Sequence, residues 1–447
     1  MHRYIPHTDE DIRSMLDKCG MTSTAELYAD VPQELLHKGD YQVGPEMSET
    51  EVRRFFDALN ERNRRMICFA GGGFYHHYLP AAVESVVSRS EFLTAYTPYQ
   101  PEISQGTLQY IFEYQSMMSA LTGLPVSNAS MYDGTTATAE AMIMTVASAR
   151  KRNRVAVSST LRPETLRVLR TYARYHGVDL VEVAETEDGI TDRHELAGLI
   201  ADGKLAGVIV ATPNRHGILE DYTGLADECH AVKTLLVMNA DAAPLAALRT
   251  PGEWGADVAC GDAQSLGLPL NYGGPYLGYL CTTKALIRKM PGRIVGATTD
   301  ELGQRVFVLT LQAREQHIRR DKATSNICSN QGLMALYVTV YMALLGASGL
   351  REAACLGHAG ARYLAEKLEA TGMMKLRYPA SPTLNEFEMI TREPAAELIE
   401  RCAAAGVLAG VATGEHSILI AVTEMQTKAD MHKYVALVGE YQPSENE

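Results

Sequence analysis

Two short segments of this 447-residue chain hold residues that could bind a cofactor. Asp241 follows an apolar run that ends at Asn239, and a carboxylate at the end of a strand can protonate the nitrogen of a bound heteroaromatic ring. It equally fits the cap of a turn. Asp133 and Gly134 open a long helical stretch, where free backbone N–H groups can bind an anion or belong to an ordinary N-cap. At both positions the sequence leaves the two alternatives open.

A third segment, residues 314–330, combines cations with hydroxyl and amide side chains. Its cations are Arg314, Arg319, Arg320 and Lys322. Thr324, Ser325 and Asn326 follow, and these are donor types that bind a phosphate group, including one held by a neighbouring subunit. A run of charges is also typical of a solvated helix face.

The segment 257–278 looks like the active-site turn of a pyridoxal-phosphate (PLP) enzyme in which Gln264 stands where a lysine is expected. Such enzymes hold the resting cofactor through a lysine imine, and an amide nitrogen is not a nucleophile. The nearest lysine, Lys284, opens a segment (283–289) that we expect to be a surface helix, with Lys284 in solvent. The chain is therefore expected to be half of an enzyme, with no catalytic residue of its own.

Composition excludes several classes of protein. A formal net charge of −13 disfavours nucleic acid and anionic membranes as partners. The eight cysteines lie at wide spacings, which argues against a zinc ribbon or a disulfide framework, and the adjacent His76 and His77 have no metal-ligand spacing. We expect no metal site. The first residues hold no apolar signal core, so a cytoplasmic location is expected.

The elements that must position these residues form three predicted parts. Residues 1–60 predict an N-terminal helical arm, with Ser48 and Glu51 in a capping box. In the second part, residues 61–330, β-branched runs at 155–159, 179–183, 207–212 and 234–239 alternate with helical stretches, which predicts an α/β domain with a mostly parallel sheet. Residues 331–447 predict a small C-terminal α+β domain. Its apolar run at 333–350 fits a buried helix that links the domains better than a membrane span.

Two further loops, residues 71–78 and 96–106, are dense in glycine, tyrosine and proline. Loops of this composition often line a cleft, although a structural role for their aromatic side chains stays possible.

With these segments together, the chain resembles the glycine dehydrogenase (decarboxylating) family, the P-protein of the glycine cleavage system, and specifically the first (α) subunit of its split form. The matching blocks are YIPHT at 4–8, GGGFYHHYLP at 71–80, YTPYQPEISQG at 96–106, DGTTA at 133–137, GDAQSLG at 261–267 and the segment 314–330. Counting back from the Gly-Gly-Pro at 273–275 places the lysine of the family's catalytic half at Gln264. Likeness is weaker beyond residue 330.

The resemblance implies a type I PLP-dependent transferase-like fold and an α₂β₂ assembly. In that assembly the β subunit, not this chain, holds PLP covalently. It decarboxylates glycine and passes the aminomethyl group to the lipoyl arm of the H-protein. We expect Thr324, Ser325 and Asn326 to complete the partner's phosphate site, and Tyr96, Tyr99 and Glu102 to line the substrate channel. The alternative is a structural or regulatory paralogue that binds the catalytic subunit without shaping its site.

Overall fold

The computed structural model describes residues 6–39, 41–149, 151–271, 273–312, 316–323, 325, 327 and 329–441. The chain divides into two compact units, Met1–Arg64 and Arg65–Glu447. The boundary at residue 330 between a large and a small domain stays a prediction.

The first unit contains α1 (Asp9–Cys19), the 3₁₀ helix η1 (Thr24–Tyr28) and α2 (Glu49–Arg62). The capping box at the start of α2 is confirmed: the Ser48 hydroxyl accepts from the Glu51 N–H, and the Glu51 carboxylate accepts from the Ser48 N–H at 2.7 Å. On α2, Val52, Phe55 and Phe56 are exposed. Their spacing places them on one side of the helix.

The second unit is built on a seven-stranded sheet with the order β2-β8-β7-β6-β5-β3-β4. All neighbours from β7 to β4 are parallel, and β8 runs antiparallel to both β7 and β2. The strands are β2 (Val126–Ser127), β3 (Arg154–Ser158), β4 (Asp179–Val183), β5 (Leu205–Thr212), β6 (Leu235–Ala240), β7 (Val258–Asp262) and β8 (Gly278–Thr282).

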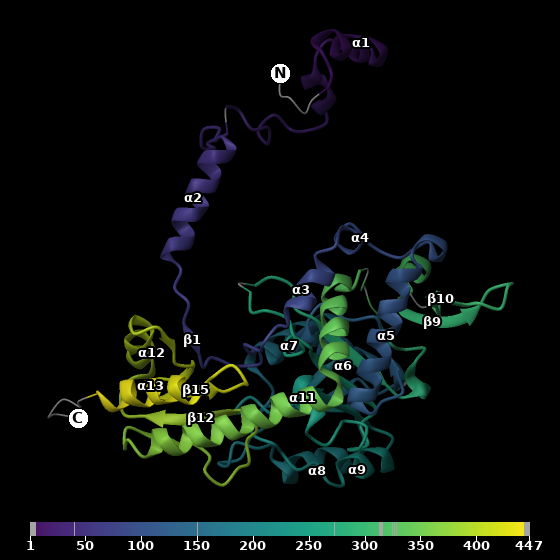
Figure 1. The fold of residues 1–447 in the computed structure, drawn as a ribbon. Coiled ribbons are helices and arrows are strands. Elements are labelled where there is room, and N and C mark those ends of the chain that lie inside the picture. Colours follow the sequence, from purple (N-terminus) through teal and green to yellow (C-terminus); the bar gives the residue numbers. More distant parts are fainter. Residues whose placement is uncertain are drawn as a thin grey trace. The chain divides into compact units, whose positions relative to one another are not determined.

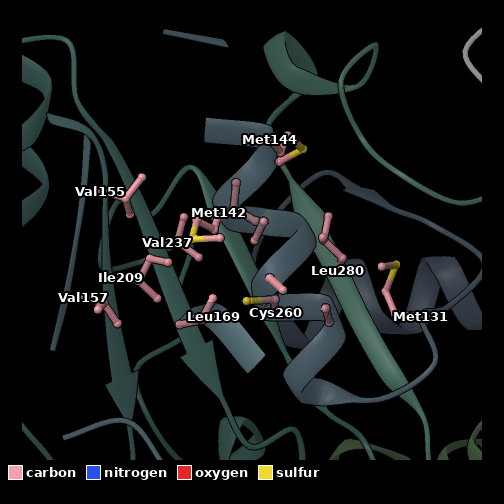
Figure 2. Close-up of a cluster of buried hydrophobic side chains, with 14 of the residues drawn as sticks. Met131, Met142, Met144, Val155, Val157, Leu169, Ile209, Val237, Cys260 and Leu280 are labelled. Carbon is pink, nitrogen blue, oxygen red and sulfur yellow. The ribbon is translucent and has the colours of Figure 1, made fainter. Parts of the chain in front are cut away.

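Helices cover both faces of this sheet (Figure 1), as the alternation of strands and helices in the sequence predicts. Helices α6 (Gly134–Ser148) and α7 (Pro163–His176) pack on one face, and α8 (Arg193–Ala201) and α9 (Leu225–Ala231) on the other. Successive residues of one strand alternate between the two cores: Val155 and Val157 pack with α6 and α7, and Ala156 packs with α8 and α9. Figure 2 shows Met142 of α6 and Leu169 of α7 beside the strands in the first of these cores.

A smaller antiparallel sheet has the order β11-β12-β15-β14. Its strands are β11 (Met374–Leu376), β12 (Glu386–Thr391), β14 (Val411–Gly414) and β15 (Ser417–Ala421), and α12 (Ala395–Ala404) and α13 (Lys428–Gly439) share a hydrophobic core with it. The short strands β1 (Ile67–Cys68) and β13 (Val407–Leu408) pair in parallel, so the start of the second unit is fixed to its C-terminal part.

Helix α11 (Gly332–Glu369) connects the two cores and bends at Gly346, whose φ of 60° and ψ of −177° are non-helical. Figure 1 shows its first half beside α5 (Gln105–Thr122) and its second half running along the smaller sheet. By length and composition alone, α11 could cross a membrane. In the folded chain, however, Val338 and Leu364 pack into the two cores, as expected of a helix that links domains.

The remaining elements lie mostly at the edges of the large sheet. They are α3 (Ala81–Val87), α4 (Ser90–Leu93), η2 (Pro101–Ile103), η3 (Ala243–Ala246), η4 (Lys284–Leu286), the hairpin β9 (Ile294–Thr299) and β10 (Arg305–Thr310), α10 (Gln316–Arg319) and η6 (Arg320–Lys322). The surface helix expected at 283–289 is wrong in extent, because only the single 3₁₀ turn η4 forms there. Lys284 is exposed, as predicted.

Candidate functional site

Gln264, at the position expected for a lysine, follows β7 and is completely buried. Its Nε2 donates to the carbonyl oxygens of Tyr75 at 2.9 Å and of Leu268 at 2.7 Å, while its Oε1 accepts from the Tyr75 N–H at 2.8 Å. Both amide hydrogens are therefore used by backbone carbonyls. The side chain connects the turn after β7 to the loop at 71–78, and this is a structural role.

Asp241 lies where the sequence places it, at the carboxyl end of β6, on the wall of a cavity of about 170 Å³. The Ser265 hydroxyl donates a short hydrogen bond to Asp241 Oδ1. Burial raises the pKa of Asp241 to about 6. The cavity is also lined by Asp133, Gly134, Thr135, Arg162, Glu164 and Asp262, together with Gly73, Phe74, Thr165, Pro213, Asn239 and Ala240.

At the start of α6 the structure shows an N-cap filled by the chain's own carboxylates. Asp133 Oδ1 accepts from the Thr136 N–H at 2.8 Å. The Gly134 N–H donates to Asp262 Oδ2 at 3.0 Å, and the other oxygen of Asp262 accepts from the Gln264 N–H at 2.8 Å. Burial raises the pKa of Asp262 to about 7. The chain's own carboxylates thus cap this helix start at the N–H groups of Gly134 and Thr136, in agreement with the N-cap alternative.

These residues do not fit PLP. Among the described residues that line the cavity there is no lysine, and two backbone donors at the start of α6, the N–H groups of Gly134 and Thr136, are occupied by Asp262 and Asp133. Only Arg162 supplies a cation among the carboxylates of this cavity. A dianionic phosphate would therefore meet net negative charge.

The glycine-rich loop at 71–78 is fixed to the smaller sheet by Glu386 of β12. The Gly72 N–H donates to Glu386 Oε1 at 2.5 Å, and the Tyr75 hydroxyl donates to Glu386 Oε2 at 3.0 Å. Arg162 Nη2 in turn donates to the Tyr75 oxygen at 2.9 Å. Burial, and then the Glu386 charge, raise the pKa of Tyr75, so the phenol stays protonated as a donor. The expectation that this loop lines a cleft holds for Gly73 and Phe74, which reach the cavity.

The residues expected to line a substrate channel lie on an exposed surface. Tyr96 and Tyr99 are 78% and 57% exposed, and Glu102, in η2, is also exposed. The Tyr96 hydroxyl is 3.0 Å from Ser329 Oγ, so the loop at 96–102 and the end of the hydroxyl-rich segment lie side by side. The structure brings Tyr96 to this segment, and Tyr96 is not among the residues that line the cavity around Asp241.

Of the expected phosphate-binding residues, Thr324 and Asn326 lie outside the described residues, as does Arg314. Ser325 is described: its hydroxyl oxygen accepts from the Ile327 N–H at 3.2 Å. It also hydrogen-bonds to Glu140 of α6, a carboxyl group whose pKa is raised to about 7 by burial.

The sequence analysis did not single out Asp262, Glu386 or Arg293. Asp262 could have been found, because it belongs to the same turn as Gln264. Glu386 is 314 positions from Gly72, and no local sequence pattern predicts that contact. Arg293 is 5% exposed, and its guanidinium carbon is 5.4 Å from the centre of the Tyr99 ring.

The fold and the position of the cavity define a class: the chain has the fold of type I PLP-dependent enzymes. An alanine–glyoxylate aminotransferase from Nostoc sp. has this fold, with a TM-score of 0.60 and 14% identity over 85% of this chain and 98% of the other. A glutamate decarboxylase from Lactobacillus brevis has it as well, with a TM-score of 0.67 and 13% identity over 94% of this chain and 98% of the other.

Closer relatives narrow the class. The family model described as glycine cleavage system P-protein matches residues 2–438. A crystal structure of glycine decarboxylase (P-protein) of the glycine cleavage system, in inhibitor-bound form, superimposes with a TM-score of 0.89 and 39% identity over 98% of this chain and 100% of that chain. The chain belongs to the glycine cleavage system P-protein family.

Among curated relatives, a probable glycine dehydrogenase (decarboxylating) subunit 1 from Brevibacillus brevis is 45% identical over 439 residues, 96% of this chain and 97% of the relative. The protein of the same name from Bacillus pumilus is 44% identical over 448 residues, 98% and 99% of the two chains. The similarity thus extends through the C-terminal part, where the sequence blocks alone show only weaker likeness.

Proposed function

We propose that this chain is the α subunit (subunit 1) of a two-subunit glycine dehydrogenase (decarboxylating), an oxidoreductase of the glycine cleavage system, and that it contributes binding surface but no covalent chemistry. The family of the chain and the names of its full-length relatives support the activity. One observation carries the non-catalytic role: the amide of Gln264 is buried and hydrogen-bonded to backbone at the position where a lysine would hold the cofactor.

In this proposal a lysine-bearing β subunit holds PLP covalently, and bound PLP supplies the electron sink for the decarboxylation of glycine. The two chains form an α₂β₂ assembly in the cytoplasm. The aminomethyl group passes to the lipoyl arm of the H-protein. The acidic cavity around Asp241 supports the division of labour, since its described lining residues include no lysine and Asp262 occupies the Gly134 N–H.

The exposed surface around Tyr96 and Tyr99 is the proposed contribution of this chain to the shared site, with Glu102 beside them. Thr324, Ser325 and Asn326 complete the partner's phosphate site in the same proposal. The contact between Tyr96 and Ser329 supports it, because it brings the two segments to one surface.

Thr324→Ala tests the phosphate role. The co-expressed α/β complex of this variant is expected to lose PLP faster on dialysis, because one hydroxyl donor to an anion contributes about 1.5–3 kcal/mol. Ser329→Ala is the matched control, because its hydroxyl already contacts Tyr96 in this chain. PLP retention and turnover equal to those of the parent complex would remove Thr324 from the site.

The decisive experiment compares the chain alone, the β subunit alone and the co-expressed pair in glycine–bicarbonate exchange. We expect exchange only from the pair, and no borohydride-reducible PLP on the isolated chain. A reducible adduct on this chain would contradict the non-catalytic role. Full activity of the β subunit alone would favour the structural or regulatory paralogue instead.

A further inference from the structure

We infer that Arg293 is an anion-binding residue, which donates to a carboxylate or phosphate oxyanion that the assembled enzyme presents beside Tyr99. The inference rests on the proposed function, because the anion is either the carboxylate of glycine or the phosphate of the partner's PLP. Both are oxyanions, and a guanidinium is suited to either.

The first observation is that Arg293 is buried with hydrogen bonds unmade. The residue is 5% exposed, and among the described residues neither Nε nor Nη1 has a hydrogen-bond partner. A buried cation with unmade hydrogen bonds is costly, so it is retained where a ligand or partner completes it.

Three other arginines of this chain form ion pairs with glutamates. Arg401 forms an ion pair with Glu393, and Arg377 lies 2.9 Å from Glu388. Arg162 lies 3.6 Å from Glu386 and donates to the Tyr75 hydroxyl. Arg293, in contrast, has two buried donor atoms, Nε and Nη1, without a hydrogen-bond partner among the described residues.

The second observation is that the backbone around Arg293 is fixed. The Arg293 carbonyl accepts from the Ala129 N–H at 2.8 Å, and Asn128 Nδ2 donates to the Pro291 carbonyl at 3.0 Å. Between them, Gly292 has a φ of 74° and packs so close to Asn128 that a Cβ there would lie 3.0 Å from its Nδ2. The backbone that carries the Arg293 side chain is thus fixed by hydrogen bonds and close packing.

The third observation is the position of this turn. Asn330 Nδ2 donates to the Ala129 carbonyl at 3.2 Å, so the segment that carries Ser325 and Ser329 is attached to the same turn. On another side lies the ring of Tyr99, with the guanidinium carbon 5.4 Å from its centre. Arg293 therefore lies where the two segments proposed to face the partner's site converge.

The test uses the co-expressed α/β complex with Arg293→Gln and Arg293→Lys. Arg305→Gln is a matched control, because Arg305 also lies 5.4 Å from an aromatic ring, that of Phe307, but is exposed. Each complex is titrated with glycine and with methylamine, which lacks the carboxylate, and the shift of the cofactor absorbance band gives the dissociation constant. PLP retention on dialysis is measured in parallel.

If the anion is the carboxylate, Arg293→Gln weakens glycine by about 10- to 100-fold, the range for hydrogen bonds to a charged group, and leaves methylamine and PLP retention unchanged. If it is the phosphate, PLP retention falls, and glycine binding at saturating PLP is unchanged. Arg293→Lys, which keeps a point charge, recovers part of either loss, and Arg305→Gln shows neither.

Two results overturn the inference. One is unchanged glycine binding and unchanged PLP retention in Arg293→Gln. The other is loss of the α/β complex itself, seen by mass photometry, which would make Arg293 half of an ion pair between subunits. The urea midpoint of the isolated chain is expected to stay the same or rise in Arg293→Gln, since an unpaired buried charge is removed. Failure of the proposed function is distinguishable, because then the parent complex itself shows no exchange that depends on this chain.

Discussion

Replacement of Gln264 by leucine tests whether this side chain is the structural bridge that the geometry indicates. Leucine has a similar volume and keeps the site apolar, but it removes the bonds to the Tyr75 N–H, the Tyr75 carbonyl and the Leu268 carbonyl. At about 1 kcal/mol for each bond, the free energy of unfolding should fall by about 3 kcal/mol. The value rises toward about 5 kcal/mol if the buried Tyr75 N–H finds no new partner.

Gln115 supplies a matched control. It is also buried, and its amide makes two bonds to one residue, donating to the Val295 carbonyl at 2.9 Å and accepting from the Val295 N–H at 2.9 Å. Gln115→Leu should therefore cost about 2 kcal/mol by the same reasoning. It lies on α5 and leaves the turn after β7 untouched.

The assay is urea unfolding of the isolated chain, followed by the fluorescence of its one tryptophan, Trp254, which lies under the Arg249 guanidinium. A loss below about 1 kcal/mol in Gln264→Leu, or a loss no larger than in Gln115→Leu, would refute the bridge. Gln264 would then be free for another role.

Three further outcomes are expected. Gln264→Lys should not give a borohydride-reducible PLP adduct on this chain. The carbonyls that now bind the amide would hold a protonated amine, and Asp262 would still occupy the Gly134 N–H. A reducible adduct would contradict this prediction. Burial raises the pKa values of Asp262 and Glu140 to about 7, so at these two groups the folded chain binds protons more readily than the unfolded chain. Their contribution to the free energy of unfolding is greatest below the unfolded pKa and falls as pH rises through 7, by about 1.4 kcal/mol per group between pH 6 and pH 8. The urea midpoint of Asp262→Asn should therefore fall less over this pH range than that of the parent chain. Burial opposes protonation of His216, but its carboxylate partners raise its pKa, so His216→Gln should cost more stability at pH 6 than at pH 9, and an equal cost at both would contradict the ion pair.

Most of the large sheet could be predicted from the sequence because its signals are local. The β-branched run at 179–183 is β4 with the same bounds, and the helical stretch between it and the run at 155–159 is α7. Each of these elements has its own periodicity, its own cap and a short connection to the next. The hairpin of β9 and β10 was not predicted, because its exposed strand ends have little apolar alternation.

Two residues of the site could be predicted from the sequence, but the hydrogen bonds between distant residues of the site could not. Gln264 and Asp241 lie at strand ends, and a strand end can be located from the pattern of the strand. That Asp262 binds the Gly134 N–H could not be read from spacing, because the two residues are 128 positions apart. The partners of Glu386 and the burial of Arg293 likewise depend on tertiary packing, which a local pattern does not encode.

The position where a lysine is expected and the start of α6, where a phosphate would bind, are connected in this chain through the carboxylate of Asp262. Both Asp262 carboxylate oxygens have a backbone partner, one at the start of α6 and the other at Gln264 itself. One carboxylate thus joins the position of the missing amine to the place where a phosphate would bind. Because this carboxylate already accepts from the Gly134 N–H, a change to lysine at 264 alone leaves that donor closed to a phosphate. Beside the exposed ring of Tyr99, Arg293 has donors, Nε and Nη1, that have no hydrogen-bond partner among the described residues, so we place the capacity of this chain to bind an anion there and not at the cavity around Asp241.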